Sequence, residues 1–395
     1  MLQKLVLVLS ATLISDQILG RAVTSILSRP PPQIIQERTY RTRSDIYHHD
    51  LKKLVSSHAL WGGRNVPFLT NSLGFRDGTT RTISIESKSH RLLFIGDSFT
   101  EGVGVEYKES FVGIVDQKLR RCGVEVLNAG VVSYSPSIYY RKVRYLIEEV
   151  GLGFAELIVF LDVSDIEDEA IYYDLDSNDT VVDSPLSPVK DVFTPTERAR
   201  VERDKPLKTR LKESSVLLQI ADFLKDRLVE GRPERSAPIQ PTRSPIGLER
   251  SSWTFDDEIY RRYGGDGLEQ ARHAMELLLE HLRIHGRELT LVVYPWPDQI
   301  AARDERSRQV TYWKSWAARR RVRFVDLFPS FIRDADPDRV LDRYFIHGDI
   351  HFNEEGHRLV AEHFLRTRSD LRTRCDSPAS SDRPRVGPVP DGSAA

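Results

Sequence analysis

The fold of this chain is decided by residues 91–102, which read RLLFIGDSFTEG. The stretch opens with a short apolar run that suits a buried strand and is too short for a helix. The run stops at Gly96, Ser98 follows two residues later, and Phe111 begins the first expected helix. A serine on such a turn projects above the edge of the sheet, where ligands bind and backbone N–H groups can hold an oxyanion. Ser98 is therefore the candidate nucleophile; the alternative is a serine that caps a helix.

Size and composition allow a large globular domain. The chain has 395 residues, of which 40% are hydrophobic, and one α/β domain with an insertion can use this length. The formal net charge of −1 gives no sign of a nucleic-acid partner. Two cysteines, Cys122 and Cys375, indicate neither a disulfide framework nor a zinc site.

Four further apolar runs alternate with helical patterns along the chain. Helices are expected at about 138–149, 267–285 and 310–318, and after Asn353, which suits a helix N-cap. The four runs are residues 124–127, 157–161, 289–294 and 322–325. Alternation of this kind predicts the α/β class, as a three-layer α/β/α sandwich around a five-stranded parallel sheet.

A second motif lies far downstream, at residues 348–357, which read GDIHFNEEGH. Together with the turn at Ser98, it resembles the SGNH/GDSL hydrolase superfamily over about residues 65–370. The segment NSLGFRD at residues 71–77 is similar to one in exported, polysaccharide-associated members. There Gly74 allows a turn, and Arg76 is expected to pair with a carboxylate. The resemblance implies a flavodoxin-like sheet with strand order 2-1-3-4-5.

The resemblance also implies a catalytic triad of Ser98, His351 and Asp349. The superfamily usually spaces the last two as Asp-x-x-His, and here Gly348 occupies the position three before His351. Asp349, two before, is kept as the orienting carboxylate because this spacing also occurs in polysaccharide-modifying relatives. His357 falls inside the last helix and is expected to be structural.

The expected oxyanion donors are the N–H groups of Ser98 and Ser133 and the hydroxyl of Ser164. Ser133 stands where the superfamily has a glycine, and Gly130 is the nearest other candidate. The third motif, Gly-x-Asn-Asp, is changed more deeply, since Asp162 replaces the glycine and Ser164 the asparagine. A serine hydroxyl is shorter than an asparagine amide, so this change weakens the predicted oxyanion hole.

Three residues at the ends of predicted strands are expected to contact substrate. They are Asp165, Trp296, which can stack on a sugar ring, and Gln299, which can bond a hydroxyl. For Trp296, the alternative is a tryptophan that plugs the surface of the domain.

The remaining segments are organised around this domain. Residues 1–28 are expected to be a signal anchor or a signal peptide, because Lys4 precedes an apolar run from Leu5 to Ser15; the alternative is an amphipathic helix docked on the protein. A linker and N-terminal arm follow at 29–64. A largely polar insertion covers about 174–265, with one amphipathic helix at 214–228, and a disordered tail covers 371–395.

These features predict an exported serine esterase, tethered to the membrane by its N-terminal segment and acting without cofactor or metal through an acyl-serine. The expected partner is an acylated glycan or small ester, with O-acetyl groups of envelope or extracellular glycans in first place. Two alternatives stay open: an O-acetyltransferase of a cell-surface polysaccharide, and a non-catalytic glycan-binding protein on the same fold.

Overall fold

The computed structural model describes residue 16 and residues 32–86, 89–184, 250–334 and 336–376. Apart from Asp16, the predicted signal segment therefore lies outside the described residues, as do the predicted helix at 214–228 and the tail from 377 onward. No helix in the described part of the chain is long and apolar enough to cross a membrane.

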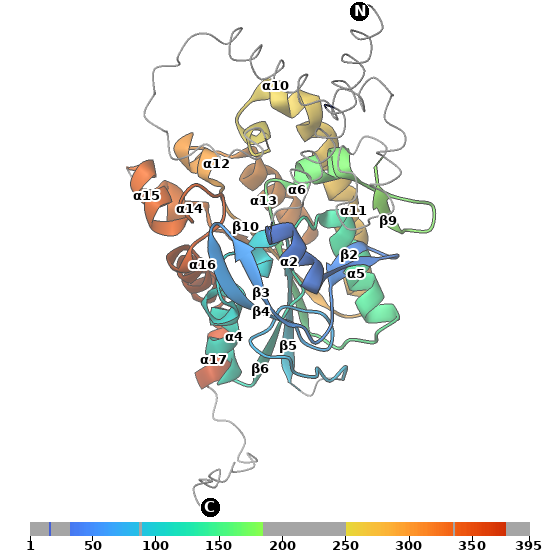
Figure 1. The fold of residues 1–395 in the computed structure, drawn as a ribbon. Helices are drawn as coiled ribbons and strands as arrows, with labels where there is room; N and C mark the ends of the chain where they lie inside the picture. The colour runs from blue at the N-terminus through green and yellow to red at the C-terminus, as the bar shows by residue number, and fades with distance from the viewer. Residues whose placement is uncertain (1–15, 17–31, 87–88, 185–249, 335, 377–395) are drawn as a thin grey trace, which may run out of the picture.

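A five-stranded parallel sheet forms the centre of the molecule (Figure 1). Its order is β11-β10-β7-β5-β6, and all four neighbouring pairs are parallel. Numbered along the chain, this order is 2-1-3-4-5, so the predicted fold and strand order are confirmed. The strands are β5 (His90–Gly96), β6 (Val124–Asn128), β7 (Glu156–Leu161), β10 (Glu288–Val293) and β11 (Arg323–Asp326).

Helices cover both faces of the sheet because each has an apolar stripe to bury. On one face α4 (Phe111–Arg120) packs against α16 (Glu354–Thr367), and on the other α5 (Pro136–Glu148) packs against α11 (Gly265–Ile284). The helix α13 (Arg308–Arg320) packs along β10 and β11. The buried side chains of α11 recur at helical spacing, in agreement with the helix predicted at 267–285, and include Leu268, Ala271, Met275, Leu278, Leu279 and Leu282.

The segment predicted as linker and arm is folded onto the sheet domain from residue 32 onward. Tyr40 and the nearby Phe68 stack at 4.1 Å, are both 1% exposed, and belong to the same buried apolar cluster as the sheet strands. The segment consists of α2 (Pro32–Tyr40) and two antiparallel hairpins, β1 (Arg41–Ser44) with β2 (His48–Leu51), and β3 (Ser56–Trp61) with β4 (Arg64–Leu69).

Buried ion pairs fix this arm to the core. Lys142 of α5 is fully buried and donates to Asp50 of β2 at 2.8 Å and to the Tyr134 hydroxyl at 3.0 Å. A buried charge is tolerated inside a protein only when it is paired. The ion pair between Asp50 and Lys142 therefore stabilises the packing of the arm against α5.

Both edges of the predicted insertion are ordered. A hairpin of β8 (Tyr173–Leu175) and β9 (Val181–Asp183) follows β7, and the returning chain buries Trp253 completely. The indole of Trp253 donates to the carbonyl of Val163 at 2.9 Å, which ties this edge to the end of β7. Residues 185–249 are not described.

The first residues of the segment predicted as a disordered tail are helical, since they belong to α17 (Ser369–Asp376), which packs against α16. Leu371 is fully buried, and Arg368 pairs with Glu156 at 2.8 Å. The expectation for the cysteines is also wrong, since Cys122 is disulfide-bonded.

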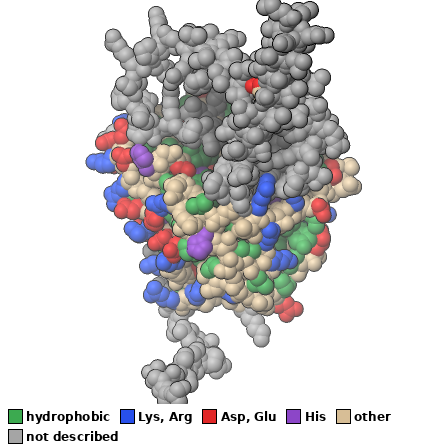
Figure 2. Space-filling model, viewed as in Figure 1, with side chains coloured by type: hydrophobic (Ala, Val, Ile, Leu, Met, Phe, Trp, Pro, Cys, Tyr) green, Lys and Arg blue, Asp and Glu red, His purple; other side chains and the backbone are tan. Residues whose placement is uncertain are grey.

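The shorter elements connect these layers. They are α3 (Ser98–Glu101), η1 (Tyr107–Glu109), α6 (Asp165–Glu167), η2 (Asp168–Tyr172), η3 (Ser252–Thr254), α10 (Asp257–Ile259), η4 (Tyr260–Gly264), α12 (Pro297–Ala301), α14 (Phe328–Ile332) and α15 (Pro337–Tyr344). On the face shown in Figure 2, acidic and basic side chains are interspersed, in keeping with the small net charge.

Candidate active site

Ser98 sits on a tight turn between β5 and α3. A Cβ on Gly96 would overlap the Thr100 hydroxyl and lie 2.7 Å from the carbonyl oxygen of Phe160 on the neighbouring strand β7. Only glycine therefore allows the turn to lie this close to the sheet. Asp97 caps α3 by accepting the N–H of Phe99 at 3.0 Å, and Ser98 is the first residue of the helix.

Two arginines hold α3 in place. Arg41 of the arm binds Glu101 with both terminal nitrogens, at 2.8 and 2.9 Å. Arg76 donates to the carbonyls of Glu101 at 2.8 Å, Val105 and Gly102. Arg76 was expected to pair with a carboxylate. It instead binds backbone carbonyl groups that follow Ser98 in the chain. The predicted turn at Gly74 is present, with φ of 79°.

The three predicted triad residues come together at the end of the sheet. Ser98 Oγ lies 2.8 Å from His351 Nε2, and His351 Nδ1 lies 2.5 Å from Asp349 Oδ1. With a carboxylate accepting at Nδ1, the imidazole carries its proton there and leaves Nε2 free to accept the serine proton. The short Asp-x-His spacing works because Asp349 also accepts the N–H of His351 at 3.0 Å, which folds the loop back on itself.

The N-terminal arm extends the series of hydrogen bonds that runs from Ser98 through His351 to Asp349. Trp61, at the end of β3, donates its indole N–H to Asp349 Oδ2 at 2.9 Å. The rings of Trp61 and Phe99 pack against His351, with centroids at 5.0 and 4.8 Å. Burial opposes ionisation of Asp349, but the hydrogen bonds from His351 and Trp61 outweigh it and lower the pKa of Asp349.

Trp61 was not among the predicted site residues, because residues 29–64 have the composition of a linker and arm. A signal was available, since Trp61 precedes the pair Gly62-Gly63, which is typical of a two-residue hairpin turn. Both glycines have positive φ, of 54° and 72°.

The structure describes the backbone at each predicted oxyanion donor. Ser133 has φ of 60°, a left-handed conformation that glycine, the residue of the resembled motif, adopts more readily. Gly130, the other candidate, donates its N–H to Asn128 Oδ1 at 3.0 Å. Ser164 is buried and caps α6, with its N–H donating to Asp162 Oδ1 at 2.7 Å. Only its hydroxyl is left for an oxyanion.

Three buried carboxyl groups lie behind the nucleophile. Candidate oxygens of Asp97, Asp162 and Asp165 all lie within 4.8 Å of one another. Asp162 accepts from the Tyr294 hydroxyl at 2.7 Å and from the Trp296 indole at 2.8 Å. These partners are hydrogen-bond donors that a cation would have to displace. Burial, and next the charge of Asp162, raise the pKa of Asp97 well above its usual value.

The three predicted substrate contacts are buried in the protein. Asp165 is fully buried and accepts from the Tyr139 hydroxyl at 2.8 Å. Trp296 is 1% exposed, with its indole N–H committed to Asp162. Gln299 is fully buried and accepts the N–H of Trp296 at 2.9 Å, as part of the cap of α12. Trp296 was expected to stack on a sugar ring, but its indole turns inward to the carboxylate of Asp162.

His357 is structural, as expected. It is fully buried and its Nδ1 accepts the N–H of Phe111 at 3.2 Å. Burial, helped by Arg76 and His351, lowers the pKa of His357 to about 3.

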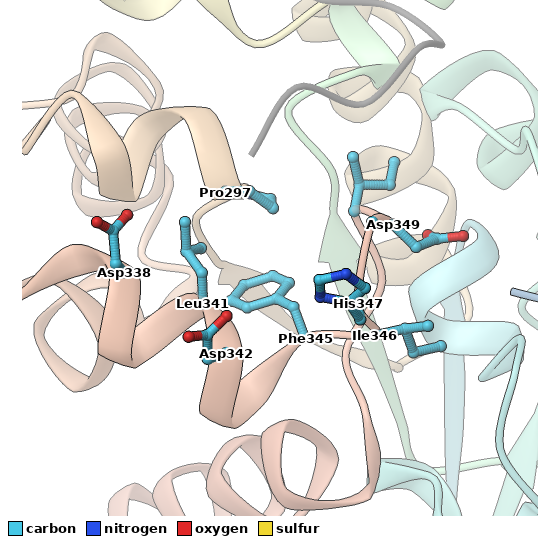
Figure 3. Close-up of a pocket in the computed structure, with 10 residues that line it drawn as sticks. Pro297, Asp338, Leu341, Asp342, Phe345, Ile346, His347 and Asp349 are labelled. Carbon is cyan, nitrogen blue, oxygen red and sulfur yellow. The ribbon is translucent and has the colours of Figure 1, made fainter. Parts of the chain in front are cut away.

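A pocket adjoins the loop that carries the triad acid and base. Figure 3 shows it between α15 and the segment with His347 and Asp349. Its lining combines apolar and acidic side chains, among them Pro297, Leu341, Phe345, Asp338 and Asp342.

Comparisons with known proteins add likenesses of fold. No family model matches the sequence, and no curated protein matches it. Among solved structures, a member of the lipolytic protein G-D-S-L family from Veillonella parvula shares 14% identity, covering 71% of this chain and 99% of the other, with a TM-score of 0.34. An esterase from Pseudoalteromonas sp. shares 9%, covering 72% and 99%, with a TM-score of 0.33. A catalytic mutant of an acetylxylan esterase from Geobacillus stearothermophilus shares 15%, covering 72% and 95%, with a TM-score of 0.35.

The contact between Trp61 and Asp349 predicts a role for the arm in activity. Trp61→Phe keeps an aromatic ring beside His351 but removes the indole N–H. Since a hydrogen bond to a charged group contributes about 1.5–3 kcal/mol, we expect kcat on a small acetyl ester to fall about tenfold or more. The matched control is Trp316→Phe on α13, where the indole N–H has no hydrogen-bond partner among the described residues. Equal kcat values for the two variants would contradict the role of Trp61.

The weakened oxyanion hole gives a second prediction. We expect the N–H groups of Ser98 and Ser133 to carry most of the stabilisation, so Ser164→Ala should lower kcat by less than the roughly 100- to 1,000-fold typical for a lost side-chain donor. Ser164→Asn restores the amide found in relatives and is expected to raise kcat if the loop accommodates it. Both are measured on one small acetyl ester. A loss in Ser164→Ala as large as in Ser98→Ala would give Ser164 a primary role.

Proposed function

We propose that this protein is a serine esterase that works through an acyl-enzyme. The observation that carries the proposal is the continuous hydrogen-bond chain from Ser98 through His351 to Asp349, extended by Trp61. A nucleophile, a base and an orienting carboxylate within hydrogen-bond reach are what such catalysis requires. The same chain argues against the non-catalytic alternative, because a binding protein has no need of it.

The reaction proceeds in two halves. Ser98 Oγ attacks the ester carbonyl while its proton passes to His351 Nε2, and the tetrahedral oxyanion faces the N–H groups of Ser98 and Ser133. His351 then protonates the leaving alcohol, and the acyl group stays on Ser98. Water attacks the acyl-enzyme with His351 as base, and the proton returns to Ser98 Oγ as the acid leaves. Asp349 stays ionised throughout and stabilises the imidazolium.

The substrate in this proposal is an O-acetylated glycan. Since Trp296 and Gln299 are buried, contacts to a sugar are assigned to the pocket beside Asp349. The exposed carboxylates of Asp338 and Asp342, which line this pocket, suit the hydroxyls of a sugar. A sugar hydroxyl in place of water would make the same site an O-acetyltransferase.

Export is part of the proposal. Lys4 and the apolar run from Leu5 to Ser15 support it, and so does the disulfide-bonded state of Cys122, because disulfides persist mainly in oxidising compartments.

The nucleophile is tested directly. Ser98→Ala is expected to fold normally and to lose hydrolysis of a small acetyl ester by at least about a thousandfold, since triad residues act as a unit. A fluorophosphonate probe should label the wild type at Ser98 alone. Undiminished turnover in Ser98→Ala would remove the whole mechanism.

Export is tested with reporters fused after Pro32. A phosphatase that folds only outside the cytoplasm should be active in this fusion, and deletion of residues 1–28 should abolish its activity. A fusion that works only with a cytoplasmic reporter would contradict the assignment.

A further inference from the structure

The Ser98 hydroxyl faces two acceptors but has one proton to donate. Its Oγ lies 2.8 Å from His351 Nε2 and 3.1 Å from Asp97 Oδ2. If the proton points to His351, as base catalysis requires, then an ionised Asp97 would place a second set of lone pairs against Oγ. The contact is favourable in that state only if Asp97 itself donates.

The two oxygens of Asp97 have different surroundings. Oδ1 faces the N–H of Phe99 at 3.0 Å and the hydroxyl of Tyr294 at 3.2 Å, so it is placed to accept. Oδ2 faces Ser98, and no donor other than that hydroxyl contacts it among the described residues. A proton on Oδ2 would therefore allow Asp97 to donate a hydrogen bond to Ser98 Oγ.

Asp162 is the better site for the negative charge. It accepts from Ser164 N–H, from the Trp296 indole and from the Tyr294 hydroxyl, which is closer to Asp162 than to Asp97. Two adjacent carboxylates in a buried site do not both ionise readily, and the one with fewer donors keeps the proton. Burial and the neighbouring charge of Asp162 act on Asp97 in that direction.

Other titratable groups around the pair do not reverse this assignment. Burial raises the pKa values of Asp165, Tyr139 and Tyr294, which keeps all three groups neutral. Arg250 acts on Asp162 and favours the charge there, although its own hydrogen bonds go to Glu167 and Asp168. The groups around the pair are Asp165, Tyr139, Tyr294, Asp168 and Arg250, and His351 contacts the Ser98 hydroxyl. Asp168 is paired with Arg250, and burial raises the pKa of Asp168 to about 7, so its charge opposes that of Asp162 only weakly at neutral pH.

We propose that Asp97 and Asp162 share one proton, which rests on Asp97 Oδ2 and is donated as a hydrogen bond to Ser98 Oγ. The inference rests on the proposed esterase function and adds to it a second donor at the nucleophile. The bond occupies a lone pair of Oγ, so the serine proton turns to His351. When the acyl-enzyme breaks down, the bond pair between carbon and Oγ returns to Oγ, and the donor stabilises this charge until His351 supplies the proton. The Asp97 proton itself is not transferred.

Asparagine provides a matched test, because its amide has the pattern of a protonated carboxyl. In Asp97→Asn, Oδ1 can still accept from Phe99 and the amide nitrogen can donate to Ser98. We expect kcat within about tenfold of wild type, whereas Asp97→Ala, which lacks the donor, should lose roughly 100- to 1,000-fold. If Asp97 is instead an ionised acceptor, Asp97→Asn reverses its hydrogen bond and should fall as far as Asp97→Ala, which would overturn the proposal.

Infrared spectroscopy tests the proton without relying on activity. The difference spectrum between wild type and Asp97→Asn at neutral pH should show the loss of a protonated carboxyl band. Loss of carboxylate bands would place the negative charge on Asp97 and refute the assignment. In Asp162→Asn the neighbouring charge is gone, so the band of Asp97 should disappear at lower pH than in wild type. An unchanged titration would show that the two carboxyls do not share a proton.

Failure of this inference is distinguishable from failure of the esterase proposal. Wild-type protein that hydrolyses the ester and is labelled by a fluorophosphonate at Ser98, but has an ionised Asp97, loses only the shared proton. Folding of each variant is checked by its thermal transition, and the infrared assignment holds for any variant that melts cooperatively.

Discussion

The close approach of Gly96 to strand β7 is the constraint on which the site depends. Because no side chain fits between Gly96 and the carbonyl of Phe160, the chain leaves β5 directly over its neighbour. Asp97 is thereby brought against the residues that end β7, and Ser98 is raised to the edge of the sheet. A larger residue would move the whole turn, and with it the alignment of Ser98 with a histidine carried by a distant loop.

This placement makes the residue that follows β7 important for the site. Asp162 stands where the motif of the resembled superfamily has glycine, and it introduces a carboxylate into a site that already contains Asp97 and Asp165. Burying such charges is unfavourable unless donors satisfy them. Tyr294, Trp296 and the N–H of Ser164 meet that need, so residues that the sequence suggested for substrate and oxyanion serve in part to stabilise a carboxylate.

The sequence predicted the fold from local signals. It also named Ser98, Asp349 and His351 through two short motifs that resemble a known superfamily, and the structure brings these three side chains into hydrogen-bond contact. Apolar runs and helical spacing are set by periodicity, and the turn at Ser98 and the loop at His351 each lie in one short motif. The direction of a side chain is different, since it depends on contacts between distant segments. Trp296 and Gln299 follow a strand and looked accessible, yet both turn inward. Trp61 lies outside any motif, and only the folding of the arm brings it to Asp349.

The contacts of the arm determine how short a fragment of this protein can be and still contain the complete proposed site. The sheet, its helices and all three triad residues lie after residue 89, so a fragment lacking the arm would contain every element of the fold by which such a domain is recognised. It would nevertheless lack the indole on Asp349 and the guanidinium of Arg41 on Glu101, and it would leave the buried amine of Lys142 without Asp50. The proposed catalytic unit therefore includes more of the chain than the α/β fold alone, and it begins within the segment that the sequence predicted to be a linker and arm.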